Sequence, residues 1–572
     1  MSVYLYVILG YLIVLLAFNF YRSRKIKSHE DFMVAGRSLS LKVMVFTLIC
    51  TWIGSGTFIA GAEYAAKAGW SSLWLPAGAW VGIAVIFFLA GKIRTFGQYT
   101  IGDILEVRYG KFARLFGAVA LIIAFVTIVS YQFRAGGYIL NVLSAGGISV
   151  ETGQTLTAAF VILFTALGGM MAVAHTDLPN GIIIVLACLV AVPLVILFAG
   201  GWNAAPASLP ATHFQTFSAD FGEHPWLKGG AYFLATMMLL MGVQSMYQKF
   251  YSAKTPREAK TAVGLWIIGT IVVETVVVVI AIYGASANWV QLKTFDISRQ
   301  LQTEVSASTV PVDLANRVDA LVSEGEAAGQ IKPSQAVELR ETFQAELYPL
   351  HGDREAVLAK LNRMGDDPAS IVLVAARNLT GTGWLGLVAG MLLLAAACVV
   401  VLSTGMNYLL SPSTNIMRDI YQRFIRPDAP SERMVALQKV FIVVLGVCAF
   451  LMIFIPTVLK LKISVLSYSY FAYTMYGVSI TPALLAALSW KRATKLGGTV
   501  SIISGAFVAL LLEIVVPNFF PEVMRGPVGS QDPWGIPSIY PALLISVLAL
   551  VVVSYLTPPP DPEKLKALFP EH

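Results

Sequence analysis

The sequence has few charged residues. Asp, Glu, Lys and Arg make up 13% of the 572 residues, whereas soluble domains carry roughly 25%. Apolar residues account for 57% of the chain, and one globular core cannot bury that much apolar surface. The composition therefore excludes an ordinary soluble protein and predicts an all-α polytopic protein embedded in a lipid bilayer.

Cysteine is also scarce, and its pattern gives no sign of a metal site and no information on the redox compartment. The four cysteines form no CxxC pair and no Cys/His cluster at metal-binding spacing. The chain also lacks HExxH, GxSxG and Walker-type patterns. We therefore expect no enzyme, and no cofactor apart from a transported ion.

Apolar runs of about 20 residues predict thirteen membrane spans. They cover residues 3–21, 42–66, 72–91, 114–144, 154–174, 178–200, 230–247, 262–286, 383–410, 435–457, 463–488, 494–516 and 537–556. Most Lys and Arg residues of the short loops fall on one side, which the positive-inside rule assigns to the cytoplasm. This bias predicts an outer N-terminus, an inner C-terminus and a multi-pass protein of the cell membrane, plasma or inner. The same clusters explain the net charge of +7 and leave no basic domain to bind nucleic acid.

A polar stretch at 288–380 interrupts the apolar pattern. It contains helix-like runs, and Pro333 is placed to begin one of them. We expect a small external helical hairpin that covers the outer vestibule or meets a partner. The alternative is a poorly ordered tether, because the stretch has few aromatic residues from which to build a core.

Six segments resemble those of the sodium/solute symporter family, which includes the proline, pantothenate and sodium/glucose symporters. They are residues 31–40 (DFMVAGRSLS), 100–110 (TIGDILEVRYG), 168–177 (GGMMAVAHTD), 248–254 (QKFYSAK), 418–421 (RDIY) and 482–497. No single segment is specific, but all six occur in the family's order along nearly the whole chain. Only the external stretch and the last span lack a matching segment.

The resemblance implies a leucine-transporter-like core of two inverted five-helix repeats, with solute and ion bound at mid-membrane beside broken helices. The chain then divides into six parts. These are the first span with its cytoplasmic signature loop (1–41), spans 2–6 (42–200), the outer loop with spans 7–8 (201–287), the external insertion (288–380), spans 9–11 (381–490), and spans 12–13 with a short tail (491–572).

A sodium site is expected where the second span breaks. Residues 51–57 (TWIGSGT) combine two glycines with three hydroxyl groups, and unwound carbonyls at membrane depth must line a cavity or hold an ion. The resemblance implies five oxygen ligands. They are the carbonyls of Cys50, Ile53 and Val400 and the hydroxyls of Ser403 and Thr404. The alternative is that Ser403 and Thr404 bond to carbonyls one turn earlier in their own helix.

Asp177 precedes the expected sixth span, where the family also has an Asp. It either helps to release sodium, or binds protons in a proton-coupled scheme, or caps the helix that follows. Some relatives combine this Asp with two further hydroxyls to hold a second sodium. Met406 and Asn407 stand at those positions, so the resemblance does not imply a second sodium here.

Arg134 is the most informative candidate for the solute site. Inside the fourth span it either grips a substrate carboxylate or snorkels toward the outer surface. Other candidates for a small polar solute are hydroxyl, amide and aromatic groups near the expected break, although aromatic residues also anchor spans at the interface. They are Ser55, Thr57, Thr236, Gln244, Ser467, Tyr468 and Tyr470. Leu239 occupies the position of a gate tyrosine in the sugar transporters, which favours an organic acid or amino acid over a sugar.

These observations favour a sodium-coupled symporter that imports a small polar metabolite by alternating access and can work as a monomer. A solute sensor or scaffold is the second hypothesis, and it would need a larger inner domain than the tail from residue 557 provides. A membrane enzyme is the third, and the missing motifs argue against it.

Overall fold

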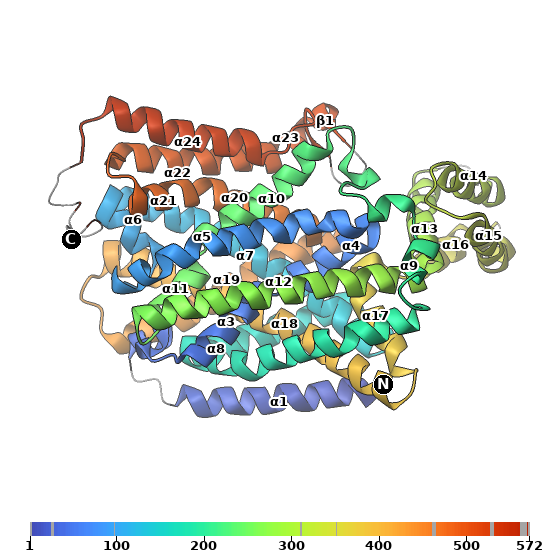
Figure 1. Cartoon of the computed structure of the whole chain (residues 1–572), viewed down its shortest axis with the longest axis horizontal. Coiled ribbons are helices and arrows are strands. Elements are labelled where there is room, and N and C mark those ends of the chain that lie inside the picture. Colours follow the sequence, from blue (N-terminus) through green and yellow to red (C-terminus); the bar gives the residue numbers. More distant parts are fainter. Residues whose placement is uncertain are drawn as a thin grey trace.

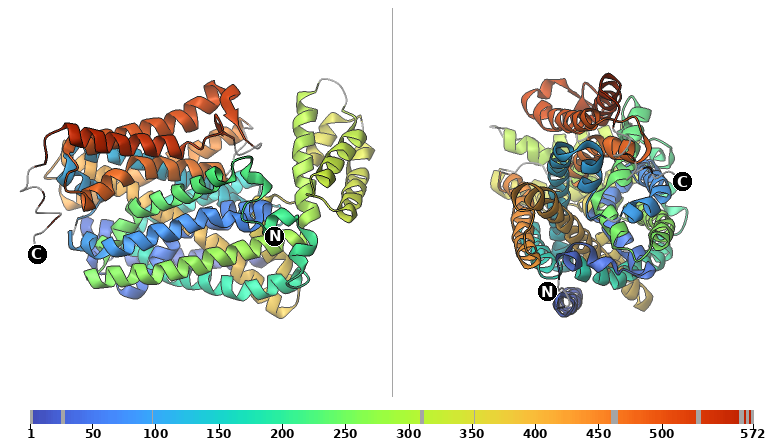
Figure 2. Two further views of the ribbon diagram at one scale, coloured as in Figure 1. Left: turned by 45° about the horizontal axis from the view of Figure 1, so that its top comes forward. Right: turned by 90° about the vertical axis from the view of Figure 1, so that its left-hand side faces the viewer.

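The computed structural model describes residues 3–24, 28–96, 98–308, 312–350, 352–459, 465–526, 531–560, 565 and 569. The start of the predicted span 463–488 and most of the end of the tail lie outside this part of the chain. Long helices run side by side to form one bundle, and a group of short helices projects from one end of it (Figures 1 and 2). The start of α1 lies at the same end as this group, and α24 ends at the opposite end (Figure 1).

The α-helices and strands follow one another in chain order. They are α1 (Val3–Ser23), α2 (His29–Val34), α3 (Leu41–Trp52), α4 (Ala62–Ala68), α5 (Trp74–Phe96), α6 (Ile101–Tyr109), α7 (Lys111–Leu143), α8 (Val150–Phe198), α9 (Ala204–Ser208), α10 (Pro225–Gly242), α11 (Gln244–Ser252), α12 (Pro256–Ala287), α13 (Trp289–Ala307), α14 (Leu314–Ala327), α15 (Pro333–Leu347), α16 (Arg354–Leu361), α17 (Ile371–Thr380), α18 (Trp384–Asn415), α19 (Ser431–Val458), α20 (Val465–Ser479), α21 (Thr481–Ser489), α22 (Lys495–Leu510), α23 (Val516–Phe519), β1 (Met524–Arg525), β2 (Asp532–Pro533) and α24 (Ile539–Leu556). The strands β1 and β2 pair antiparallel.

Shorter helical segments connect these elements. The π-helical ones are η2 (Gly56–Gly61), η8 (Ile416–Ile425) and η9 (Leu511–Val515). The 3₁₀ turns are η1 (Ala35–Arg37), η3 (Gly69–Leu73), η4 (Ala211–Phe214), η5 (Ala219–Phe221), η6 (Tyr348–Leu350), η7 (Pro368–Ser370) and η10 (Pro521–Val523).

Ten helical stretches of the described chain are long and apolar enough to cross a membrane. The thirteen predicted spans all overlap helices. Three differences explain why the structure has only ten long apolar helices where thirteen spans were predicted. The apolar helices 5–21 and 41–52 are shorter than a full span. The third difference is that α8 contains both the fifth and the sixth predicted spans. The all-helical membrane architecture is therefore confirmed, and the number of thirteen crossings stays a prediction.

Two long apolar segments are broken in the middle. The first break follows α3, where Ile53 adopts an extended conformation before η2 begins. The second break follows α10, where Val243 is extended before α11 begins. The glycines and hydroxyls of residues 51–57 predicted the first break, whereas the second was not predicted. Both breaks leave backbone carbonyls without helical partners inside the bundle.

The fifth and sixth predicted spans meet at a glycine rather than at Asp177. Gly169 has φ 51° and ψ −159°, and a Cβ there would lie 2.7 Å from the ring of Phe32. A side chain at this residue would therefore be strained and would clash. The helix resumes directly after Gly169, so Asp177 lies inside α8 and is not its N-cap. The capping interpretation of Asp177 is wrong.

The polar stretch, called the external domain after its predicted position, folds as a small unit with its own core. Helices α13 to α16 bury Leu and Val side chains together with Phe343 in a cluster separate from that of the bundle. The expected two-helix hairpin is therefore too simple, and the tether alternative is wrong. The aliphatic residues supply the core that the low aromatic content argued against. Helix α17 packs on α12 and α18 of the bundle, so the domain ends earlier than residue 380.

The chain enters the external domain and leaves it at neighbouring positions. A Cβ on Gly365 would lie 2.3 Å from the backbone nitrogen of Phe295, and Asp366 N–H donates to Gln291 O at 3.2 Å. We expect a variant that lacks residues 296–364, with Phe295 joined to Gly365, to fold and to keep a cooperative melting transition. Size-exclusion chromatography and a thermal melt in detergent check this, and aggregation of the shortened chain would contradict it.

Candidate functional site

A small cavity lies beside the first break. Its wall comes from both sides of that break and from η3, α5, α10, α12 and α20. The lining residues are Trp52, Gly56, Thr57, Gly61, Ser72, Leu75, Pro76, Thr236, Glu274, Val277, Val278 and Tyr473. The cavity combines apolar walls with a few polar groups, as ligand sites do.

Glu274 is the one Asp, Glu, Lys, Arg or His side chain in this lining. It is buried on α12, and each of its carboxylate oxygens accepts a hydrogen bond from an indole. Trp52 Nε1 donates to Oε1 at 2.8 Å, and Trp80 Nε1 donates to Oε2 at 2.6 Å. The two indoles fix the carboxylate at the cavity wall. Sequence reasoning missed this residue, although a lone carboxylate within the apolar run 262–286 is a signal of function.

Aromatic rings form another part of the wall. The rings of Trp52 and Tyr473 are 6.0 Å apart between centroids, and Tyr131 Oη donates to Tyr473 Oη at 3.5 Å. A Cβ on Gly56 would lie 2.6 Å from Tyr473 Oη, so this glycine allows the tyrosine to reach the broken helix. Neither Trp52 nor Tyr473 was among the sequence candidates.

Of four predicted solute residues, two line the cavity and two lie outside its lining. Thr57 and Thr236 line the cavity, and the Thr236 hydroxyl donates to Leu75 O at 2.6 Å. Ser55 lies behind the wall, where its N–H donates to Gln132 Oε1 at 3.1 Å. Gln244 holds a loop at one end of the bundle, because its Oε1 accepts from Ile101 N–H at 2.7 Å.

The other four predicted solute residues lie away from the cavity lining. Arg134 donates to Gln154 Oε1 at 3.3 Å and lies 3.6 Å from a carboxylate oxygen of Glu151, as the alternative of a structural arginine requires. Tyr470 packs edge-on against Tyr232. Tyr468 donates to Met452 O at 3.4 Å, and Ser467 is exposed.

The predicted sodium ligands of α3 and α18 meet at the first break. Thr404 Oγ1 lies 2.9 Å from Cys50 O and 3.1 Å from Ile53 O. The Thr404 hydroxyl therefore bonds across to another helix instead of to its own. Val400, one turn earlier on α18, is fully buried. A Cβ on Gly54 would lie 2.8 Å from the Thr404 hydroxyl, so this glycine permits the two helices to approach.

Asp177 lies next to these oxygens, fully buried. The hydroxyl of Ser403 donates to Asp177 Oδ1. Thr47 Oγ1 and Asn407 Nδ2 donate to Oδ2 at 2.5 and 3.1 Å. The carboxylate is thus bonded to one predicted sodium ligand and to the amide of Asn407.

A buried lysine completes this group from α11. Lys249 is fully buried, and its Nζ donates to Asn407 Oδ1 at 2.7 Å and to Ser245 O at 3.3 Å. Asn407 therefore bridges Lys249 to Asp177. The segment 248–254 was identified only by resemblance, and nothing in its spacing indicated that the lysine points into the bundle.

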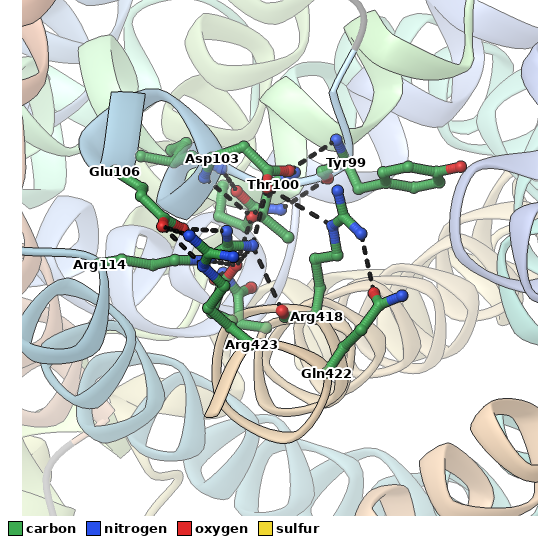
Figure 3. A network of polar contacts seen from close by, with 12 residues as sticks. Tyr99, Thr100, Asp103, Glu106, Arg114, Arg418, Gln422 and Arg423 are labelled. Carbon is green, nitrogen blue, oxygen red and sulfur yellow. Dashed lines mark hydrogen bonds and ion pairs between the residues drawn. The ribbon is translucent and has the colours of Figure 1, made fainter. Parts of the chain in front are cut away.

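A network of ion pairs (Figure 3) lies beside α6, at the end of the bundle where α24 ends (Figure 1). Arg114 of α7 contacts Asp103 at 2.7 Å, Glu106 at 2.6 Å and Asp419 at 2.6 Å. Arg423 pairs with Glu106 as well. Burial opposes the charged form of Glu106, but the hydrogen bonds from Arg114 and Arg423 outweigh it and keep its pKa below the usual value. The segments 100–110 and 418–421 thus meet in space.

Comparisons with known proteins agree with this arrangement. The profile of the sodium:solute symporter family matches residues 32–317 and 366–505, and so leaves out most of the external domain. The osmoregulated proline transporter OpuE of Bacillus subtilis is 23% identical over 98% of this chain and 96% of its own length. The high affinity choline transporter 1 of Homo sapiens is 22% identical over 99% of this chain and 88% of its own.

The fold has also been seen in a solved structure. The substrate-bound outward-open state of a Na⁺-coupled sialic acid symporter superposes with a TM-score of 0.67, at 16% sequence identity and over 98% of both chains. The likeness thus extends over nearly the whole of both chains.

Proposed function

Because the chain belongs to the sodium:solute symporter family, we propose that its cavity and its cluster of oxygens form one coupled site for a small polar solute and a sodium ion. The main support for this proposal is that the Thr404 hydroxyl bonds to two carbonyls at the break. The same break forms part of the cavity wall. The chain is a sodium-coupled transporter rather than a sensor or an enzyme.

The sodium ligands of this proposal are the carbonyls of Cys50, Ile53 and Val400 and the hydroxyls of Ser403 and Thr404. All five residues are buried, and five neutral oxygens suit a monovalent hard cation. Sodium bound there would tie α3 to α18 and fix the break. Because Gly56 and Thr57 follow this break directly and line the cavity, ion binding would complete the solute site.

The proposed transporter crosses the cell membrane thirteen times, with its N-terminus outside and its C-terminus inside. The support for this orientation is that α1 begins and α24 ends at opposite ends of the bundle (Figure 1). The positive-inside rule adds that the end carrying Arg108, Arg114 and Arg423 faces the cytoplasm. The external domain then lies outside the cell, and one chain suffices for transport.

Asp177 has two roles open to it in this scheme. It holds the hydroxyl of Ser403, so it can draw sodium from its site toward the inner side. A proton-coupled transporter that uses Asp177 instead of sodium is the second candidate function, and the observation that favours it is the complete burial of this carboxylate.

Sodium should raise the melting temperature of the purified protein, whereas potassium at equal concentration should not, because a ligand that binds only the folded state stabilises it. Thr404→Ala should abolish the sodium shift. Thr165→Ala is a matched control, since the buried Thr165 hydroxyl bonds only to Val161 O of its own helix, and it should keep the shift. Equal effects of sodium and potassium on the wild type would favour the proton-coupled alternative.

A further inference from the structure

The wall of the cavity contains a carboxyl group that no basic side chain of the lining balances. Glu274 is buried at its wall and lies within a long apolar helix. In the part of the chain that the structure describes, the ion pairs do not include Glu274. A buried charge without a partner is costly, so such residues usually have a ligand as their counter-ion.

The hydrogen bonds of Glu274 favour its ionised form. An indole N–H can only donate, and one indole donates to each carboxylate oxygen, at 2.8 Å from Trp52 and 2.6 Å from Trp80. Each oxygen keeps a further lone pair for another donor. The carboxylate is thus held as an acceptor that still lacks a positively charged partner.

The rest of the wall suits an organic cation. The rings of Trp52 and Tyr473 stand next to each other at the cavity, and aromatic faces attract ammonium groups. Leu75, Val277 and Val278 offer apolar surface for the carbon atoms attached to such a group.

A carboxylate solute lacks a corresponding partner. Arg134, the residue that the sequence offered for this role, bonds to Gln154 and lies near Glu151 instead. The cavity lining contains no Lys or Arg. An anion in this cavity would face Glu274 without compensation.

We propose that the transported solute carries an ammonium group, which pairs with Glu274 beside the rings of Trp52 and Tyr473. This inference rests on the proposed function, because it assigns the chemical class of the solute that enters with sodium. Of the two solute classes expected from the sequence, it keeps the amino acid and replaces the organic acid.

The test measures thermal shifts of the full chain in sodium with matched pairs of probes. Choline is compared with its uncharged isostere 3,3-dimethyl-1-butanol, butylammonium with butanol and butyrate, and proline with cyclopentanecarboxylate. We expect a sodium-dependent shift from at least one ammonium-bearing member and at least about tenfold weaker binding of its counterpart without the ammonium. Shifts from the uncharged or anionic members alone, or no shift from any ammonium compound, would overturn the proposal.

Variants then assign the selectivity to Glu274. Glu274→Gln keeps the shape of the side chain and should remove the shift with the ammonium probe, while Glu274→Asp keeps the charge and should retain a weaker one. Glu63→Gln is the control, since Glu63 pairs with Lys67 and does not line the cavity. An ammonium shift that survives in Glu274→Gln would contradict the proposal.

The sodium-dependent thermal shift distinguishes an error in the solute class from an error in the proposed function. A sodium shift retained in Glu274→Gln shows that this variant is folded and that its ion site is intact. If the wild type shows a sodium shift but binds no ammonium compound, the solute class is wrong and the proposed function stands. If the wild type shows no sodium shift, the proposed function itself fails.

Discussion

Arg114→Ala is expected to reduce the free energy of unfolding by roughly 3–5 kcal/mol, the cost of removing one partner from a buried ion pair. Arg114 contacts Asp103, Glu106 and Asp419 (Figure 3). Of these, Asp103 and Asp419 are buried. Without the guanidinium, their negative charges would repel one another in a place that water hardly reaches. Chemical denaturation in detergent measures the loss.

Three further variants make this prediction specific. Arg114→Lys keeps a positive charge but loses the planar fork, so it should lie between the wild type and the alanine variant. Arg114→Ala combined with Asp419→Asn should recover part of the loss. Arg340→Ala removes an arginine from two carboxylates of the external domain, where the pairs are exposed, and should cost about 1 kcal/mol or less. A loss in Arg114→Ala no larger than in Arg340→Ala would contradict the prediction.

Lys249→Met is expected to make the sodium dependence of binding steeper, with a Hill coefficient that rises from about 1 toward about 2. The ammonium of Lys249 reaches Asn407, and Asn407 donates to Asp177. Lys249 therefore supplies a positive charge beside the position where some relatives hold a second sodium. Removing that charge leaves Asp177 without compensation, so a second sodium becomes favourable there. Sodium titrations followed by thermal shift or by solute uptake measure the change.

One control for this prediction keeps both charges, and the other removes both. Lys249→Arg keeps the cation and should retain the dependence on a single ion. Lys249→Met combined with Asp177→Asn removes both charges and should return the Hill coefficient to about 1. An unchanged Hill coefficient together with unchanged sodium affinity in Lys249→Met would show that the lysine does not replace an ion.

Local composition predicted the break in the second span, whereas the predicted ion ligands came from the resemblance to the symporter family. Two glycines beside hydroxyl groups predicted the break after Trp52, and the pair Ser403 and Thr404 follows a wholly apolar octet. The structure brings Thr404 to the carbonyls of that break. The break was predictable because its signals lie together in the sequence, but its contact with Thr404 depends on helix packing, which local composition does not record.

The solute site was much harder to predict because it depends on which face each helix turns inward. Arg134 drew attention as a charge inside an apolar span, but its side chain turns toward Gln154. Glu274 gave the same kind of signal and turns to the cavity. Tertiary packing decides between these two cases, and the sequence of a single helix does not record it.

The short helix α11 contacts both the start of α6 and the predicted ion ligands. Near its start, Gln244 accepts from Ile101 N–H at the beginning of α6. Near its middle, Lys249 bonds to Asn407 beside the predicted ion ligands. Its nine residues form one helix of roughly 14 Å, which begins after the extended residue Val243. A single rigid element thus joins the predicted ion ligands to α6, so a displacement at either place would move the other.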